Sequence, residues 1–256
     1  MVYIKLFFLI YITIGTKSEK TSFQSKFIIY YCSLNIIIVS FLIRFLLYRH
    51  QSRFNIIKAK YCFEYYKVKS KLNITVYYEI LCPASVRFFT QQLRPAVELL
   101  APYLDIHLIP YGHARTFQVR GHYEFRCQHG PAECYGNKLQ ACVVDALRNN
   151  TQAVLFNSCL LQYSAYRSNY GFDYSYIMRW CSYKLHTPVQ GIITCMHNGR
   201  ASLLLKKYGD ITHALSPQYV PFVLVDGSTD KQNDASHDMI STVCKLLNPT
   251  PLVCYR

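Results

Sequence analysis

Apolar positions in residues 72–256 follow the periods of strands and helices, which predicts an alternating α/β domain. Residues 73–80 alternate in polarity and are rich in β-branched and aromatic side chains, as expected for a strand. Residues 105–111 predict a second strand, and apolar residues recur at helical spacing between Val86 and Leu104. Strand, helix and strand in succession predict a βαβ unit with parallel strands and a right-handed crossover.

Pro95 interrupts this helical pattern, and its missing N–H predicts a kink. Residues 112–215 are mostly helical in pattern. The clearest helical segments there are residues 137–148, 175–185 and 201–208. Residues 218–227 predict a further strand that ends in an Asp-Gly turn, and a short helix is expected around residues 238–247. No internal repeat interrupts these elements, so they predict one domain.

Residues 1–71 have a different character and are set apart as a leader, a signal or anchor segment, or a dubious N-terminal extension. Residues 6–15 have the length of a signal-peptide core, and residues 27–48 approach the roughly 20 residues that a membrane helix needs. The basic residues after 27–48 would keep the following domain in the cytosol under the positive-inside rule. Translated AT-rich non-coding DNA would also have this composition. Membrane contact is therefore expected only if residues 27–48 are a real anchor.

The net charge of +14 first suggests a nucleic-acid or membrane-surface binder. Residues 1–71 carry 12 Lys and Arg against 2 Asp and Glu, whereas the rest of the chain carries 16 against 12. The remainder is thus only mildly basic. It contains no zinc-finger spacing and no RNP or helix-turn-helix pattern, so no nucleic-acid partner is expected.

Nine cysteines lie in residues 72–256, which is many for a cytosolic chain. Glycosylation sequons begin at Asn73 and Asn149 in the same region. Together they favour the secretory pathway, where disulfides and glycans form. Eight of the nine cysteines can pair and leave one free. The candidates for structural disulfides are Cys127, Cys134, Cys142, Cys159, Cys181, Cys195, Cys244 and Cys254.

Cys82 lies where the first predicted strand meets the following helix, and Pro83 suits a first helical turn. That turn offers unpaired N–H groups and a positive dipole end, and thiols in such settings have pKa values of about 3.5–7.5. Ser85 occupies the position of the second thiol in a Cys-x-x-Cys site. Its hydroxyl can donate a hydrogen bond to a thiolate, but it cannot resolve a mixed disulfide. The alternative is that Cys82 is a structural half-cystine or a buried free thiol.

Pro221 precedes the last predicted strand. Most prolines at such positions only shape the entry of a loop. The functional interpretation is a cis Val220–Pro221 bond that places backbone opposite the reactive sulfur. Cis bonds form at only about 5–6% of X–Pro positions in folded proteins, so the local sequence alone does not justify this interpretation.

Residues 127–142 (CQHGPAECYGNKLQAC) closely resemble the signature of the gamma-interferon-inducible lysosomal thiol reductase family. The matching residues are Cys127, Gln128, His129, Gly130, Glu133, Cys134, Asn137 and Cys142. The segments YYEILCPAS, LIPYG and YVPFVLVDG also fit, as does Cys195 with Gly199. The resemblance therefore covers residues 72–256 in order.

This resemblance implies an α/β, thioredoxin-like fold with a helical, disulfide-rich insertion. It also implies reduction of protein disulfides in lysosomes, endosomes or outside the cell, with no bound cofactor and a small thiol such as glutathione as reductant. The partners would be disulfide-containing proteins. Cys82 carries over as the nucleophile, with Pro221 facing it. Ser85 replaces the resolving cysteine, so full dithiol turnover does not carry over.

Two alternatives stay open from the sequence. Cys127, His129, Cys134 and Cys142 offer four ligand types that zinc accepts, although their spacing fits no common finger. If they form disulfides instead, His129 is expected to be a structural hydrogen-bonding residue, and Gly130 and Asn137 are expected to serve turn and cap geometry. The chain is then either a monothiol enzyme or a catalytically weak, disulfide-rich module that binds thiol proteins. Hydrolase, nucleotide-binding and metalloprotease motifs are absent.

Overall fold

The computed structural model describes residues 71–166 and 173–255. The predicted leader and the possible anchor at 27–48 lie outside this part of the chain and stay predictions. Within the described residues, every helix is too short or too polar to cross a membrane.

A three-stranded sheet with the order β2-β1-β5 forms the centre of the domain. Strand β1 (Leu72–Tyr78) pairs in parallel with β2 (Leu104–Pro110), which confirms the predicted βαβ unit. Strand β5 (Phe222–Val225) pairs antiparallel with β1. It is shorter than the predicted 218–227, because the chain before it forms a loop with a cis Val220–Pro221 bond and the chain after it turns at Asp226 and Gly227, which both have positive φ.

The connection from β1 to β2 is a helical segment in three parts. It comprises α4 (Pro83–Phe88), a π-helical turn (Phe89–Leu93) and α5 (Arg94–Leu100), followed by a 3₁₀ turn at Ala101–Tyr103. The predicted irregularity at Pro95 takes the form of the π turn, in which the N–H of Arg94 bonds the carbonyl of Phe89. Pro95 has no N–H to donate, so widening the preceding turn lets the helix continue past it.

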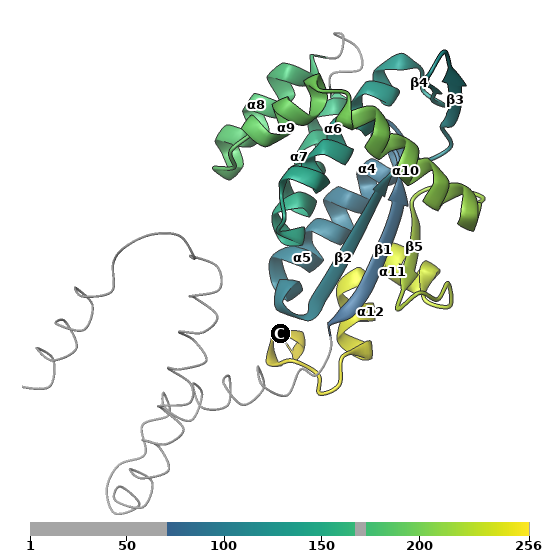
Figure 1. Cartoon of the computed structure of the whole chain (residues 1–256). Coiled ribbons are helices and arrows are strands. Elements are labelled where there is room, and N and C mark those ends of the chain that lie inside the picture. The colour runs from purple at the N-terminus through teal and green to yellow at the C-terminus, as the bar shows by residue number, and fades with distance from the viewer. Residues whose placement is uncertain (1–70, 167–172, 256) are drawn as a thin grey trace, which may run out of the picture. The chain divides into compact units, whose positions relative to one another are not determined.

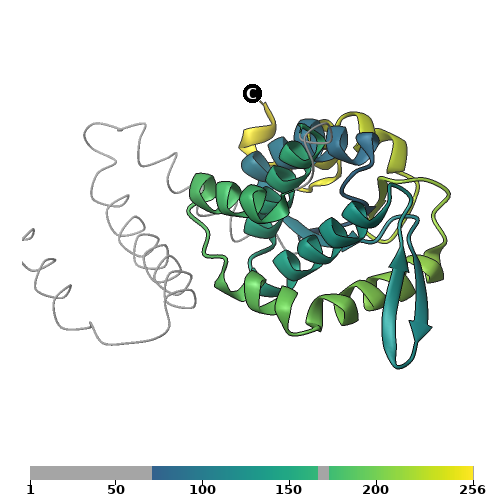
Figure 2. The same cartoon turned by 90° about the horizontal axis from the view of Figure 1, so that it is seen from above.

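Both faces of the sheet are covered, because alternate side chains of β1 enter two separate clusters. Ile74, Val76 and Tyr78 belong to the larger cluster, whereas Tyr77 joins a smaller one with Tyr208 of α10. Figures 1 and 2 show α10 on one side of the sheet and α4, α5 and α12 on the other. A strand buried on both faces explains why the apolar run in β1 is nearly continuous.

Five helices form the predicted helical insertion between β4 and β5 (Figure 1). They are α6 (Pro131–Ala146), α7 (Asn150–Tyr166), α8 (Tyr174–Leu185), α9 (Gln190–His197) and α10 (Arg200–Leu215). Helix α6 begins six residues before the predicted 137–148. Gly130, at φ 86°, lets the chain turn there, and Pro131 fits the first helical turn.

A hairpin of β3 (Arg115–Val119) and β4 (His122–Arg126) lies in the region predicted to be mostly helical. Arg120 and Gly121 form its turn with φ values of 49° and 82°, as a type I′ hairpin turn requires. The alternation of residue types around the Arg-Gly pair is the signal that the sequence analysis missed. After β5, the chain ends in α11 (Gln232–His237), α12 (Met239–Leu246) and a 3₁₀ turn (Leu252–Tyr255).

Four disulfides involve all eight candidate cysteines and leave Cys82 as the free cysteine of the described chain. The pairs are Cys127–Cys134, Cys142–Cys195, Cys159–Cys181 and Cys244–Cys254. The first joins the end of β4 to α6, and the next two join helices of the insertion. Three of the four candidate zinc ligands, Cys127, Cys134 and Cys142, are thus disulfide-bonded, and disulfide sulfurs are not the thiolates that zinc binds.

Candidate active site

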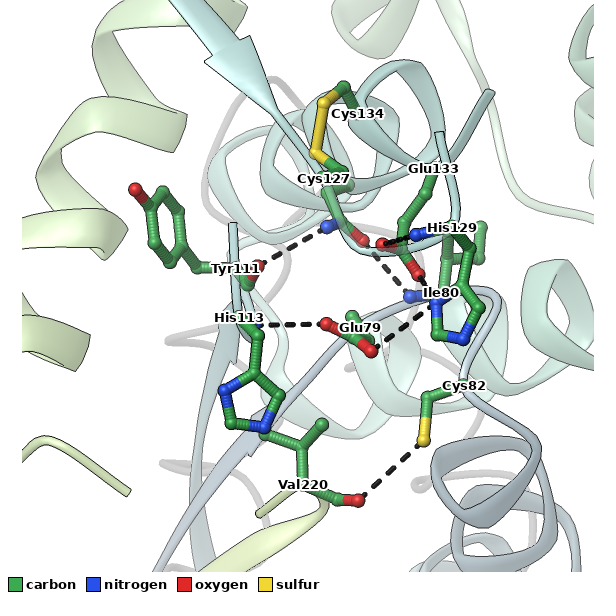
Figure 3. Close-up of polar contacts among 11 residues, drawn as sticks. Glu79, Ile80, Cys82, Tyr111, His113, Cys127, His129, Glu133, Cys134 and Val220 are labelled. Atoms are coloured by element: carbon green, nitrogen blue, oxygen red, sulfur yellow. Dashed lines mark hydrogen bonds and ion pairs between the residues drawn. A yellow bond between two sulfur atoms is a disulfide. The ribbon is translucent and has the colours of Figure 1, made fainter. Parts of the chain in front are cut away.

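Cys82 is the residue immediately before α4 and is partly exposed. Its carbonyl accepts the first helical hydrogen bond from Val86 N at 3.0 Å, and Pro83 begins the helix. Its thiol donates a hydrogen bond to the carbonyl of Val220 at 3.6 Å (Figure 3). The Val220–Pro221 bond is cis. The structure thus brings Cys82 and the Pro221 loop together from positions far apart in the sequence.

Ser85 lies one turn into the same helix, but its side chain is fully buried. Its hydroxyl has no hydrogen-bond partner among the described residues. The predicted hydrogen bond from Ser85 to the sulfur of Cys82 is therefore wrong. The extended backbone of Cys82 directs its thiol to the Val220 loop, whereas Ser85 faces the core.

A cluster of three titratable side chains lies beside this thiol (Figure 3). The Nδ1 atom of His129 is 2.6 Å from Glu133 Oε2 and 3.4 Å from Glu79 Oε1. The backbone N–H of His129 also donates to Glu133 Oε1 at 3.0 Å. Both carboxylates are buried, whereas the imidazole is 35% exposed. His129 thus makes the hydrogen bonds expected of it, and its buried partner Glu79 is a residue that the sequence analysis did not single out.

The turn after β2 holds Glu79 in place. The N–H of His113 donates to Glu79 Oε2 at 3.0 Å. Gly112 has a φ of 61°, and a Cβ atom there would lie 2.0 Å from the same oxygen. Only glycine allows the backbone to approach the carboxylate this closely. The signal in the sequence was a lone acidic residue inside an apolar run, between Tyr78 and Ile80.

Asn137 connects the strand end to the insertion. Its Oδ1 accepts from Ile80 N at 2.9 Å and its Nδ2 donates to Tyr111 O at 3.4 Å. The side chain is fully buried in the middle of α6, so it does not cap a helix as predicted. Instead it satisfies two backbone groups at the ends of β1 and β2, which fixes the chain leading to Cys82.

The remaining predicted residues are two neighbours of His129 and the two sequon asparagines. Gln128 is exposed, and Gly130 precedes α6 as the expected turn residue. Asn149 is exposed, and its Oδ1 accepts from Gln152 N at 3.3 Å. Asn73 lies on β1, partly buried. The two sequons therefore differ in access, with Asn149 the more open.

Burial, and next the charge of Glu133, raises the pKa of Glu79 from 4.5 to about 7, although the hydrogen bond from His113 and the charge of His129 offset part of the rise. Between pH 4.5 and about pH 7, Glu79 therefore keeps a proton in the folded chain that it has lost in the unfolded chain. Glu79 therefore stabilises the fold most below pH 4.5, and this contribution falls as the pH rises toward 7. The loss is on the order of 3 kcal/mol.

Glu79→Gln should remove this pH dependence, because glutamine stays neutral and still accepts from His113. Urea unfolding with the disulfides intact, at about pH 5 and pH 7.5, measures it. We expect the free energy of unfolding of the wild type to fall by about 2–3 kcal/mol more than that of the variant over this interval. Glu98→Gln, at an exposed carboxylate on α5, is the matched control and should follow the wild type. Equal slopes for the wild type and Glu79→Gln would show that Glu79 does not titrate in this way.

The free thiol before α4, the cis-proline loop facing it and the β2-β1-β5 sheet define a thioredoxin-like thiol–disulfide oxidoreductase. The profile of the family described as "Gamma interferon inducible lysosomal thiol reductase (GILT)" matches residues 73–185. The chain is 31% identical over 200 residues to a gamma-interferon-inducible lysosomal thiol reductase-like protein of Anopheles gambiae, covering 73% of this chain and 81% of that protein.

It is also 31% identical over 183 residues to the gamma-interferon-inducible lysosomal thiol reductase of Carassius auratus, covering 69% of each chain. The chain therefore belongs to the gamma-interferon-inducible lysosomal thiol reductase family. Among solved structures, the reduced disulfide bond oxidoreductase DsbG of Mycobacterium tuberculosis is similar, with a TM-score of 0.48, 15% identity, and coverage of 71% of this chain and 81% of that one.

Proposed function

We propose that this chain reduces or exchanges protein disulfides through Cys82 acting as a single thiol. The observation that carries the proposal is that Cys82 is free while the other eight cysteines of the described domain are paired. Cys82 is also partly exposed and immediately precedes a helix.

The reaction would proceed by three exchanges. The Cys82 thiolate attacks a substrate disulfide, which forms a mixed disulfide and releases one substrate thiol. Ser85 has no sulfur with which to displace the substrate, so a second thiol must come from solution. A small thiol such as glutathione attacks the substrate sulfur of the mixed disulfide, which restores Cys82 and leaves glutathione bound to the substrate. A second glutathione then frees the second substrate thiol and leaves as glutathione disulfide.

A surface hollow next to the Pro221 loop supports a protein substrate. The loop before β5 borders an open hollow of about 400 Å³ lined by Pro217, Tyr219, Phe222 and Gln232, among others. Phe222 follows Pro221 directly, so an extended chain could contact this hollow while its disulfide meets Cys82. The chain has relatives named as lysosomal thiol reductases, and it carries two glycosylation sequons and four disulfides. These features support a glycoprotein of the secretory pathway that is lysosomal, endosomal or secreted.

Insulin reduction at increasing glutathione concentration tests this proposal. We expect slow reduction by the wild type above the uncatalysed rate, with a rate that rises with glutathione up to about 10 mM because resolution limits turnover. Heat-inactivated protein provides the background rate. If the protein does not accelerate insulin reduction at any glutathione concentration, the result would favour the alternative, a disulfide-rich binding module. Ser85, in the place of a resolving cysteine, is the feature that leaves this alternative open.

A further inference from the structure

His129 contacts two buried carboxylates on one side of its ring, and Cys82 lies on the other side. Its Nδ1 contacts Glu133 at 2.6 Å and Glu79 at 3.4 Å, and both carboxylate side chains are at most 1% exposed. Figure 3 shows the imidazole between these carboxylates and Cys82, with the edge that carries Nε2 turned toward Cys82. The ring is thus anchored through one nitrogen and leaves the other available.

Two buried carboxylates at this separation repel each other unless a proton or a cation lies between them. Within the described residues, neither Glu79 nor Glu133 forms an ion pair with Lys or Arg, and His129 is the ion-pair partner of both. Glu79 Oε1 makes no hydrogen bond there and depends on the 3.4 Å contact with His129. His129 is therefore the described side chain placed to offset the charge of both carboxylates.

We propose that His129 is the proton carrier of the Cys82 site, with Glu79 and Glu133 as the positioning residues that hold its charge. This inference rests on the proposed function, because it assigns the proton transfers that thiol–disulfide exchange at Cys82 requires.

The protons and electrons balance in each step. Once the Cys82 side chain turns from Val220 toward His129, its thiol proton moves to Nε2 of neutral His129, which gives a thiolate and an imidazolium paired with Glu133. The thiolate attacks one sulfur of the substrate disulfide, so the Cys82–sulfur bond forms and the substrate S–S bond breaks. The leaving sulfur keeps the electron pair and takes the proton from Nε2. The Cys82 sulfur is oxidised to a disulfide, and the leaving sulfur is reduced to a thiol.

Two further titratable residues lie near the cluster. His113 lies on the turn after β2 and contributes its backbone N–H to Glu79. Burial, with a smaller contribution from the charge of Glu133, raises the pKa of Tyr174 on α8, so its phenol stays neutral. The titratable groups around His129 are thus its partners Glu79 and Glu133, with Cys82 beside its ring, His113 bonded to Glu79 and Tyr174 within the field of Glu133.

The test is the rate of Cys82 alkylation by iodoacetamide between about pH 5 and pH 9.5, with the same series for mixed-disulfide formation with oxidised glutathione. For His129→Gln we expect rates about tenfold or more below the wild type near pH 6.5. Above about pH 9 the two rates should converge, because an unassisted thiol ionises there. Glu79→Gln should show a smaller loss near neutral pH and the same convergence. His107→Gln, at an exposed histidine on β2 beside Asp105, is the matched control.

A merely structural role for His129 would lower the rate equally at every pH, and no role would leave the profile unchanged; either result overturns the proposal. If His129→Gln fails to form its four disulfides, the pH profile of Cys82 alkylation in Glu79→Gln tests the proposal instead. A Glu79→Gln profile that coincides with that of the wild type overturns the proposal. A wild-type Cys82 that reacts at no pH would instead contradict the proposed function. If Cys82 reacts but the variants have the same pH profiles as the wild type, the proposed function is kept and only the role of His129 is rejected.

Discussion

Cys82→Ser is expected to abolish catalysed disulfide reduction, lowering the rate of insulin reduction to the glutathione background. A serine hydroxyl has no useful nucleophilicity toward sulfur near neutral pH, and the other eight cysteines of the described domain are already paired. The replacement is nearly isosteric at a partly exposed position, so the fold should be kept. The measurement is the initial rate of insulin reduction at fixed glutathione.

Ser85→Ala is the matched control for this experiment. It removes a hydroxyl that is buried and makes no hydrogen bond among the described residues, so it should fold and keep wild-type activity. Wild-type activity in Cys82→Ser would mean that the nucleophile is misassigned. Loss of activity in Ser85→Ala would mean that the buried hydroxyl has a role that its contacts do not reveal.

Ser85→Cys is expected to convert the monothiol site into a dithiol site and to raise turnover at least about tenfold at about 1 mM glutathione. Positions 82 and 85 have the spacing of a Cys-x-x-Cys site. A disulfide needs Cβ atoms about 3.5–4.5 Å apart, so the Cys82 side chain must turn from Val220 toward position 85 to form one. The new thiol would attack the mixed disulfide on Cys82 within the same molecule. An intramolecular attack of this kind outcompetes a dissolved thiol because no association step is needed.

Steady-state rates against glutathione concentration measure this change. The wild-type rate should rise with glutathione, whereas the rate of Ser85→Cys should depend on it only through reduction of the resulting intramolecular disulfide. The double variant Cys82→Ser, Ser85→Cys carries the new thiol without the nucleophile and should be inactive. The contrary result is a Ser85→Cys variant that forms the four native disulfides and a fifth between residues 82 and 85 but gains no rate. That result would show that resolution of the mixed disulfide does not limit the wild type.

The order of elements around Cys82 could be predicted because the signals are local. The alternation in β1, the helical period after Val86 and the apolar run in β2 each follow from neighbouring residues. The fold class and the helical insertion followed from the resemblance at residues 127–142. The hairpin β3–β4 was missed because its mostly exposed strands carry few apolar residues, so the helical signals on either side dominated the interpretation.

The site could be predicted less completely, because its contacts join residues that are far apart in the sequence. Nothing near Glu79 indicates a partner at His129, fifty residues later, or an N–H from His113. Asn137 was expected to act as a cap, since the sequence does not show that it satisfies the backbone of Ile80 and Tyr111. The direction of a thiol before a helix also depends on one backbone angle, which is why the bond expected from Ser85 is replaced by one to Val220.

The most direct test of the central claim is to locate the covalent adduct by mass spectrometry after incubation with a disulfide substrate. The fully reduced site is mixed with oxidised glutathione while free thiol is scarce, quenched in acid and digested without reduction. We expect one adduct, on the peptide that contains Cys82, and four native disulfides elsewhere in residues 71–255. An adduct on any of the other eight cysteines in place of Cys82 would contradict the account. So would the absence of an adduct in a protein preparation that reduces insulin.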